Sequence, residues 1–575
     1  MSSIGSPSPF FLAGKKAYQV ERSLRFNDDD GAYLERTPSS AGNRKKWTFS
    51  AWIKRSGLGF EQRIFGGKAN ASHIYLDSND KLTWDLANED SGTPSANLLT
   101  SQVFRDVSAW FHLVCALDTD NSTADNRMKI YFNGTEVTSF STRSNPSSGY
   151  ATNAINAASV HTVGRRLSSQ GSDGMRFDGY MAEINFIDGF QYDPSYFGET
   201  DAITGQWNPK KYVGSYGTNG FYLNFSDNSG TTATTLGKDS SGNGNNFTPN
   251  NFSVSAGAGN DSLEDSPTNN FCTLNPLSFG GTFSNGNLDH VTGTNSGRRF
   301  LGSFGVSSGK WYWETTVNNL AAGLMIGIGN TTDYANNNTF IGYQSGTYGW
   351  YSFTSNSEKY YNGSSASYGT AFTAGQTIGL ALDLDNGTLT FYAYDGSSVG
   401  VLQSSLPSAT YYPIYGDGSS SNTSSVSVNF GQRAFTHSIP TGHKALNSSN
   451  LPDPTILLPN KHFNTLLYTG AGSEQEVNGL SFQPDWVWLK ERTGSGTSHG
   501  LFDSVRGRAA GLASNQTNAE YTSSASNDLV SFDSDGFTVG GFQNFYTNRS
   551  GGYNYVAWNW NAGDTDGKTY TVKVV

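Results

Sequence analysis

Residues 47–54 read WTFSAWIK, and this stretch decides the class of fold. Trp47, Phe49, Ala51 and Ile53 occupy every second position in it. Successive side chains of a β-strand point to opposite faces of the sheet, so this spacing places all four residues on one face. The stretch therefore predicts a half-buried strand with a single face toward a hydrophobic core.

The same strand signal recurs along the chain, often beside a turn signal. KIYF at 129–132 precedes Asn133-Gly134, and Asn386-Gly387 precedes another strand-like run. Asn-Gly is a strong hairpin signal because a type I′ turn needs positive φ at both central residues. No long stretch shows apolar residues at the helical period. We therefore expect an all-β chain of short strands joined by tight turns.

Composition supports several folded domains. The chain has 575 residues, whereas a typical domain has roughly 100–200, so we expect about three or four domains. Aromatic residues make up 14% of the chain and charged residues 15%. Disordered chains are poor in aromatic residues and rich in charge, so this composition argues against disorder. The formal net charge of −11 argues against a nucleic-acid partner, because such proteins usually carry a basic footprint.

Two cysteines, Cys115 and Cys272, are too few for a disulfide framework or a zinc site. Cys115 lies in the strand-like run FHLVCAL, which predicts a buried free thiol. The N-terminus lacks the basic region and apolar run of a signal peptide. No stretch of 18 apolar residues occurs. We expect a protein that is made in a cytoplasm, is not secreted and is not inserted into a membrane.

Shifts in composition divide the chain into three blocks and their connections. The predicted organisation is an N-terminal segment at 1–17, a first domain at 18–225, a Gly/Asn/Ser/Thr-rich linker at 226–275, a second domain at 276–436, a proline-rich linker at 437–460, a third β-rich module at 461–563 and a tail segment at 564–575.

The first block carries a set of motifs in a characteristic order. They are SLRFNDDDG at 23–31, WTFSAWIK at 47–54, WFHLV at 110–114, KIYFNG at 129–134 and FDGYMAEINFIDGF at 177–190. This order resembles the laminin-G/concanavalin A-like lectin family. The resemblance implies an antiparallel jelly-roll sandwich, in a family that includes both sugar binders and glucan hydrolases.

The hydrolases of that family carry Glu-x-Asp-x-x-Glu along one strand, since glycoside hydrolysis needs two carboxylates that flank the scissile bond. The corresponding strand here has Glu183, but Asn185 replaces the middle acid and no second Glu follows. We therefore expect Glu183 to be structural and the protein to be no enzyme.

The lectin resemblance also raises the question of calcium, which such domains often hold with loop carboxylates. Asp28, Asp29 and Asp30 are the candidate ligands. The alternative is that they are solvated acids of a turn, because their spacing matches no known calcium loop. Calcium is thus a possible ligand, and no cofactor is expected to be required.

The second block resembles the SPRY family, another β-sandwich. The matching motifs are GKWYWE at 309–314, MIGIG at 325–329, GQTIGLALDLDN at 375–386 and VNFGQRAF at 428–435. The resemblance implies a protein-interaction module whose loops at one rim bind partners. It implies no catalytic residue, and Trp311, Trp313 and Phe391 are expected in the core.

The third block contains FQPDWVWLK at 482–490, SFDSDGFTVG at 531–540 and YVAWNW at 555–560. It resembles an uncharacterised C-terminal module of marine phage and phage-derived proteins, where it occurs beside lectin-like domains. That association implies a virion protein.

Aromatic side chains in polar, loop-like stretches are the candidates for carbohydrate or partner binding, because a flat ring can cover the apolar face of a sugar. The candidates are Tyr150, Tyr348, Trp350, Tyr351, Tyr360 and Tyr361. The alternative for each is a place in the sandwich core, which large aromatics dominate.

Together these observations predict tandem antiparallel β-sandwiches in a surface protein of a tailed, cyanophage-like bacteriophage. We expect a tail fibre or similar appendage that binds a host-surface glycan or receptor during adsorption. Residues 1–17 would dock it to other virion proteins, and a homotrimer is expected by analogy with fibres. The alternatives are a capsid decoration or head-fibre protein, and a glycan-degrading enzyme.

Overall fold

The computed structural model describes residues 18–67, 72–87, 94–167, 175–201, 204–278, 281–293, 299–321, 323–330, 340–354, 356–417, 422–452, 456, 458–494, 497–541, 545 and 547–562. Within these ranges the chain is all-β, as predicted. Helical residues in this part are confined to four 3₁₀ turns: η1 (Ala124–Asn126), η2 (Pro194–Tyr196), η3 (Ser448–Asn450) and η4 (Pro459–Lys461). In the same ranges no helix has the length and hydrophobicity that crossing a membrane requires.

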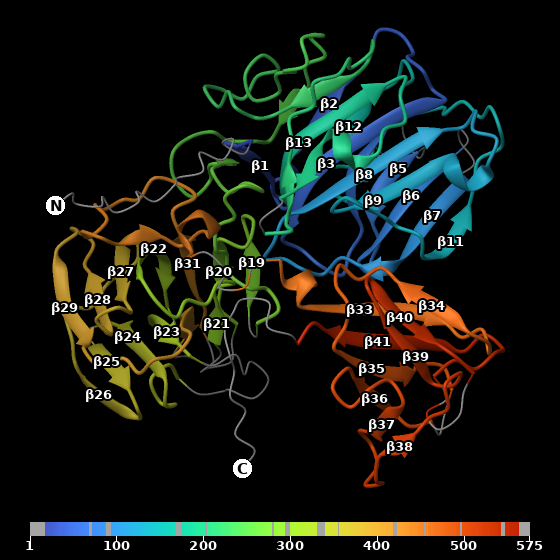
Figure 1. Ribbon diagram of the computed structural model, residues 1–575. Coiled ribbons are helices and arrows are strands. Elements are labelled where there is room, and N and C mark those ends of the chain that lie inside the picture. The colour runs from blue at the N-terminus through green and yellow to red at the C-terminus, as the bar shows by residue number, and fades with distance from the viewer. Residues whose placement is uncertain are drawn as a thin grey trace, which may run out of the picture. The chain divides into compact units, whose positions relative to one another are not determined.

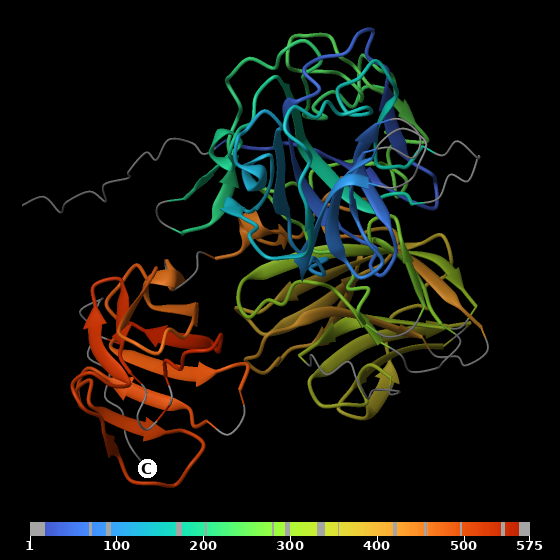
Figure 2. The same ribbon diagram turned by 90° about the vertical axis from the view of Figure 1, so that its right-hand side faces the viewer.

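The chain divides into two compact units. The first comprises residues 1–199 and 207–452, and the second comprises 200–206 and 453–575. The first unit contains two sandwiches, drawn in blue to green and in green to orange (Figure 1). Figure 2 shows the same strands after a quarter turn.

One sheet of the first sandwich has the order β10-β9-β8-β3-β13-β1-β18, and β16 also pairs with β13. These strands are β10 (Thr135–Glu136), β9 (Met128–Phe132), β8 (Phe111–Asp118), β3 (Lys46–Arg55), β13 (Gly179–Asp188), β1 (Ser23–Phe26), β18 (Ser262–Leu263) and β16 (Phe221–Leu223).

The facing sheet has the order β11-β7-β6-β5-β4-β12-β2-β17. Its strands are β11 (Phe140–Ser144), β7 (Pro94–Val103), β6 (Lys81–Ala87), β5 (His73–Leu76), β4 (Gln62–Gly67), β12 (His161–Val163), β2 (Tyr33–Arg36) and β17 (Thr248–Asn250); β14 (Gly198–Thr200) and β15 (Trp207–Pro209) form a separate pair.

Strand β3 is buried on both faces, although the sequence predicted one buried face. Trp47, Phe49, Ala51 and Ile53 lie in the core between the two sheets, as predicted. Trp52, on the opposite face, belongs to the hydrophobic cluster of the second sandwich. The prediction of a half-buried strand was wrong because a distant part of the chain covers the outer face.

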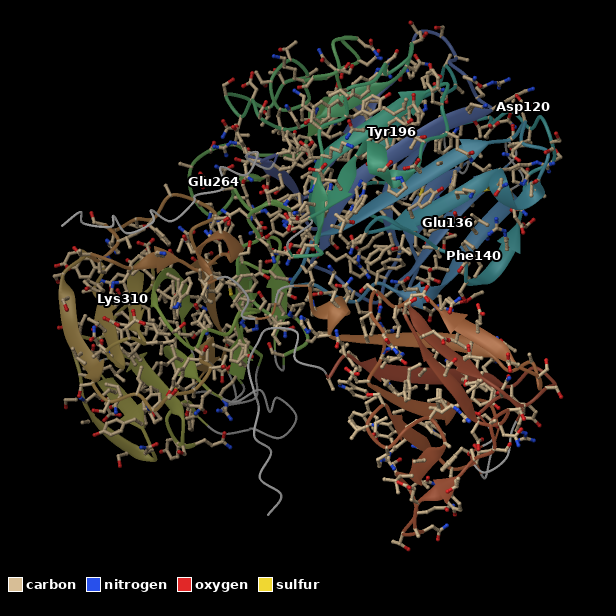
Figure 3. The ribbon with its side chains drawn as sticks, viewed as in Figure 1. Asp120, Glu136, Phe140, Tyr196, Glu264 and Lys310 are labelled. Carbon is tan, nitrogen blue, oxygen red and sulfur yellow. The ribbon has the colours of Figure 1, made fainter. Side chains whose placement is uncertain are left out.

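Side chains from residues 190–199 and 207–216 cover another part of that outer face. Phe197 and Tyr212 pack with Val114 of β8 and Ile187 of β13 in a separate hydrophobic cluster. Tyr196, labelled in Figure 3, lies on the same segment and is partly exposed. The outer face of this lectin-like sheet is therefore occupied by the chain's own side chains.

The second sandwich consists of two sheets. One has the order β19-β20-β31-β22-β27-β28-β29, and β32 also pairs with β22. The other has the order β21-β30-β23-β24-β25-β26. The strands are β19 (Thr282–Ser284), β20 (Asp289–Val291), β31 (Ser424–Asn429), β22 (Lys310–Leu320), β27 (Thr377–Asp383), β28 (Thr388–Tyr392), β29 (Ser398–Gln403), β32 (Lys444–Ala445), β21 (Arg299–Leu301), β30 (Tyr412–Asp417), β23 (Leu324–Gly329), β24 (Thr347–Phe353), β25 (Asn356–Tyr361) and β26 (Ser364–Ser367). Trp311, Trp313 and Phe391 lie in its core, as predicted.

The segments predicted as connections contribute to the packed structure. Residues 226–275 contain β17 and β18, and Leu236 and Phe247 lie in the core of the first sandwich. Residues 437–460 contain β32 and η3. The predicted docking segment at 1–17 and the tail segment at 564–575 lie outside the described residues.

The second unit carries two antiparallel sheets, in the orders β33-β41-β35-β36-β37-β38 and β34-β40-β39. The strands are β33 (Phe463–Thr469), β41 (Asn554–Trp560), β35 (Trp486–Glu491), β36 (Gly500–Asp503), β37 (Ala510–Ala513), β38 (Tyr521–Thr522), β34 (Gln475–Asn478), β40 (Gly536–Val539) and β39 (Leu529–Asp533). Its core includes Val487, Leu489, Phe502 and Phe537. The third block is therefore β-rich, as predicted.

Candidate functional site

Strands β24 and β25 carry five of the six predicted binding aromatics, and the alternation of a strand separates them into two groups. Tyr348 and Trp350 point inward and are 2% and 1% exposed. Both belong to the core cluster of the second sandwich. The prediction that they bind a ligand was wrong, because the side chains fill the space between the sheets.

Tyr351 and Tyr360 point outward and line one cavity of about 250 Å³. Met325, Tyr351 and Glu358 form a row across three strands, because Tyr351 pairs with Met325 on β23 and with Glu358 on β25. Tyr360 follows two positions after Glu358 and so lies on the same face. The remaining lining residues are Phe340, Tyr343 and Asn356.

The rings of this aromatic cavity meet at different angles. The Tyr351 and Tyr360 ring centroids are 6.0 Å apart with an interplanar angle of 88°. Tyr343 stacks on Tyr360 at 5.9 Å and 21°, and it is 54% exposed. The Tyr351 and Tyr360 rings that line the cavity are therefore nearly perpendicular, and Tyr343 is an exposed ring stacked on Tyr360.

Electrostatics keep the two phenols neutral. The Tyr360 hydroxyl donates a hydrogen bond to Glu358 Oε2 at 2.6 Å. Burial, followed by the hydrogen bond and charge of Glu358, raises the pKa of Tyr360 to about 12. Burial and the same carboxylate also raise the pKa of Tyr351. The cavity thus offers aromatic rings, phenol hydroxyls, the carboxyl group of Glu358 and the amide of Asn356.

The other two predicted aromatics lie elsewhere. Tyr361 pairs with Tyr348 across the strands and packs partly buried against the same core, so it faces away from the cavity. Tyr150 packs partly buried against the core of the first sandwich. The structure therefore brings together only two of the six predicted residues.

Sequence reasoning missed Met325, Phe340, Tyr343, Asn356 and Glu358. A signal for Glu358 was present, because it alternates with Tyr360 in one strand. Met325 joins the site only through the register of β23 against β24, which a single sequence does not reveal.

Asp28, Asp29 and Asp30 form a turn before β2. The amide of Gly31 donates to the Asp28 carbonyl at 3.0 Å, and Asp30 accepts from the Asn27 side chain at 2.7 Å. Among the described residues no three His, Cys, Asp or Glu side chains are grouped so as to hold a metal. In the part of the chain that the structure describes, the three carboxylates therefore do not form such a group, and calcium binding stays a prediction.

Glu183 is buried at a β-bulge in β13, where its φ is +51° and the register with β3 shifts. Its carboxylate accepts hydrogen bonds from the hydroxyls of Tyr222 at 2.8 Å and Tyr18 at 2.9 Å. Burial raises the pKa of Glu183 to about 7. The bulge directs this carboxylate toward two phenols, in an arrangement that stabilises the packing of residues 18 and 222 on β13.

His112 and the two cysteines are also buried. His112 Nδ1 accepts from Trp207 Nε1 at 3.0 Å, and its Nε2 lies 2.8 Å from Ser50 Oγ. Burial lowers the pKa of His112 to about 3, so the ring is neutral. Cys115 and Cys272 are buried free thiols, as was predicted for Cys115.

The fold defines a multidomain all-β protein of tandem sandwiches, and comparisons with known families agree. Residues 27–189 match the model of the concanavalin A-like lectin/glucanases superfamily, and residues 310–433 match the SPRY domain. Residues 458–574 match a domain of unknown function (DUF7483). The chain thus contains a concanavalin A-like domain and a SPRY domain, as the motifs predicted.

Similar proteins share a limited part of the chain. A Ran-binding proteins 9/10 homolog of Drosophila melanogaster is 30% identical over 129 residues, which are 22% of this chain and 13% of the relative. Ran-binding protein 10 of Danio rerio is 31% identical over 136 residues, 23% of this chain and 21% of the relative. The chain therefore spans about a fifth or less of the length of these relatives.

Two SPRY domains are among the solved structures that match part of the chain. The TRIM65 PSpry domain has a TM-score of 0.23 and 16% identity, and the match covers 28% of this chain and 89% of that one. The SPRY domain of human HERC1 has a TM-score of 0.22 and 21% identity, and the match covers 26% of this chain and 91% of that one.

Proposed function

We propose that this protein is a surface protein of a tailed bacteriophage particle, in a tail fibre or another appendage, and that it binds carbohydrate on the host surface. The observation that supports this proposal is the aromatic cavity on the outer face of β23, β24 and β25. The rings of Tyr351 and Tyr360 can cover the apolar face of a sugar. Glu358 and Asn356 lie beside them and can hydrogen-bond its hydroxyls.

The virion part of the proposal rests on the resemblance of the third block to modules of phage proteins. A particle that carries many copies of one weak site gains avidity without any new contact. A cavity of about 250 Å³ that binds a short glycan weakly is consistent with that mechanism. Docking through residues 1–17 and trimer formation belong to the same proposal.

The test of carbohydrate binding compares the full-length protein with two variants on a glycan array and on susceptible host cells. Tyr360→Ala is expected to abolish most binding, because it removes the ring that contacts both Tyr343 and Tyr351. Tyr394→Ala is the matched control, since Tyr394 is an exposed tyrosine of the same sandwich that does not line the cavity. Equal binding by all three proteins would contradict the proposal.

The test of location is cryo-microscopy of particles with an antibody against this chain. Label on tail appendages is the expected result. Label on capsomers alone would assign the chain to the head and overturn the fibre proposal.

A further inference from the structure

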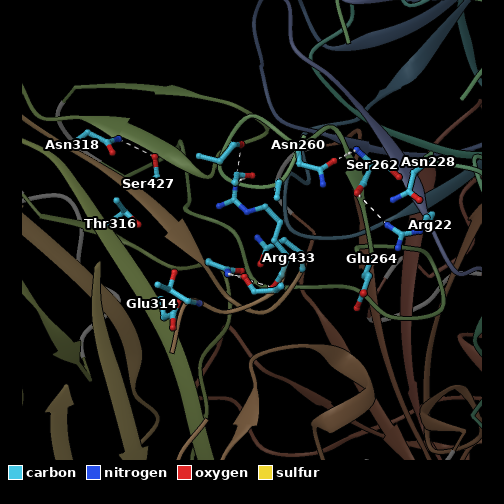
Figure 4. A pocket seen from close by; sticks show the side chains of 17 residues that line it. Arg22, Asn228, Asn260, Ser262, Glu264, Glu314, Thr316, Asn318, Ser427 and Arg433 are labelled. Atoms are coloured by element: carbon cyan, nitrogen blue, oxygen red, sulfur yellow. Dashed lines mark hydrogen bonds between the residues drawn. The ribbon is translucent and has the colours of Figure 1, made fainter. Parts of the chain in front are cut away.

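A polar cleft of about 500 Å³ lies in the first unit, where residues 256–264 face the outer side of β22 and β31 (Figure 4). Residues 432–434 and Thr436 complete the lining together with Arg22 and Asn228, which lie at one end. The cleft shares no residue with the aromatic cavity, which β23, β24 and β25 form. It is therefore a separate candidate site.

The floor of the cleft is a ladder of polar side chains on two paired strands. Glu314, Thr316 and Asn318 alternate along β22 and point away from the core, into which Trp313 and Val317 pack. On β31, Asn429 lies opposite Glu314 and Ser427 lies opposite Thr316. These five residues place amide, hydroxyl and carboxylate groups along the floor at the regular spacing of adjacent strands, and Asn318 Nδ2 donates to Ser427 Oγ at 2.8 Å.

Hydrogen bonds hold the charged groups of the cleft in place. Arg433 donates to the carbonyls of Ala258 at 2.7 Å and Val428 at 2.8 Å. The Glu314 carboxylate accepts from the backbone amides of Thr436 and His437 at 2.7 and 2.8 Å. With Arg22 and Glu264, the lining has two arginines and two glutamates, so its formal charges balance.

Gln432 supplies a second, independent observation. Its side chain lines the cleft and is 1% exposed. Its Oε1 accepts from the amide of Phe430 at 2.8 Å, whereas its Nε2 is buried and has no hydrogen-bond partner among the residues that the structure describes. A buried donor of this kind usually has a partner, so the unpaired Nε2 indicates that something hydrogen-bonds to it when the site is filled.

We propose that this cleft binds a neutral, hydroxyl-rich ligand, a segment of an oligosaccharide, through hydrogen bonds. Among the described residues that line it none is aromatic, and its apolar members are small, so it offers no pocket for the apolar anchors of a peptide. Balanced charge disfavours a polyanion, which a net positive site would attract. The inference rests on the proposed carbohydrate-binding function and adds a second subsite to it.

The experiment uses the full-length protein and an array of neutral gluco-, manno- and galacto-oligosaccharides beside oligosaccharides that contain uronic acids. Calorimetry then measures the affinity for the neutral oligosaccharide that binds best. Thr316→Trp fills the cleft and is expected to weaken binding at least tenfold. Asn318→Ala removes one exposed amide and is expected to weaken it about three- to tenfold. Asn319→Ala is the control, because Asn319 is the adjacent exposed asparagine of β22 and does not line the cleft.

The outcomes separate this inference from the proposed function. If Tyr360→Ala abolishes binding while both cleft variants keep wild-type affinity, the cleft inference is overturned and the aromatic cavity stands. If the cleft variants lose affinity and Tyr360→Ala does not, the cleft is the binding site and the proposal for the aromatic cavity fails. Preference for the uronic-acid set, or no binding to any oligosaccharide, overturns the inference. Should Thr316→Trp fail to fold, Asn318→Ala provides the same test.

Discussion

Lys54 and Asp265 form an ion pair in which Nζ lies 2.9 Å from Oδ2 and both side chains are fully buried. Lys54 also donates to Asn270 Oδ1 at 2.7 Å and to the Phe271 carbonyl at 2.9 Å, so all three ammonium protons have acceptors. Trp110 Nε1 donates to the other Asp265 oxygen at 2.8 Å. This network joins the outer face of β3 to the segment that leads into the second sandwich.

The first prediction is that removing one partner of this pair strongly destabilises the first unit. Asp265→Asn leaves the Lys54 ammonium buried without its counter-charge, which typically costs about 3–5 kcal/mol. Asp120→Asn is the control, since Lys45 and Asp120 are paired at 3.2 Å on the surface. Such a pair contributes less than about 1 kcal/mol. Chemical denaturation measures the stability of both variants, and equal denaturation midpoints for the two would contradict the prediction.

The second prediction concerns pH and Glu183. Its pKa is raised from the ordinary 4.5 to about 7 in the folded protein, so the folded state binds more protons than the unfolded state between these values. The stabilisation is complete below about pH 4.5 and is lost as pH rises through about 7. The free energy of unfolding is therefore expected to differ by about 3 kcal/mol between these two pH limits.

Glu183→Gln is expected to remove this part of the pH dependence, because the amide stays neutral throughout. Chemical denaturation at pH 5 and pH 8 measures the free energy of unfolding of the wild type and of the variant. The change in this free energy between the two pH values is then compared for the two proteins. Glu476→Gln alters an exposed carboxylate and should leave the wild-type profile unchanged. Parallel profiles for wild type and Glu183→Gln would show that Glu183 does not titrate in this range.

The third prediction separates the ring of Tyr360 from its hydroxyl. Tyr360→Phe keeps the contacts with Tyr343 and Tyr351 but loses the hydrogen bond to Glu358. Its glycan affinity is expected to fall about three- to fivefold, against about tenfold or more for Tyr360→Ala. Calorimetry measures the glycan affinity of the wild type and of both variants. If Tyr360→Phe binds as weakly as Tyr360→Ala, the loss of affinity is due to the hydroxyl and not to the ring.

The fourth prediction is that neither thiol reacts in the native protein. Burial raises the pKa of Cys115 well above its ordinary value and that of Cys272 to about 11, so little thiolate forms at neutral pH. A disulfide reagent should titrate both thiols only in denaturant. Fast reaction of a thiol without denaturant would mean that this part of the fold opens readily.

The candidate site shows where sequence reasoning stops. The sequence placed these aromatic residues in loop-like stretches, whereas five of the six lie on β24 and β25 and four of the six do not line the cavity. Tyr348 and Trp350 differ from Tyr351 and Tyr360 only in the face they occupy. A one-residue change in register reverses the faces, and register depends on neighbouring strands that are distant in the sequence.

The sequence by itself determined that the chain is all-β and that Trp47, Phe49, Ala51 and Ile53 of β3 enter the core. These properties follow from period-two alternation and from turn residues, which act over a few positions. Only the tertiary structure decided that the other face of β3 is buried and that Lys54 meets Asp265. It also decided that Met325 joins Tyr351 in one cavity. Such contacts join residues far apart in the chain, so their geometry is set by how sheets pack and not by any local pattern.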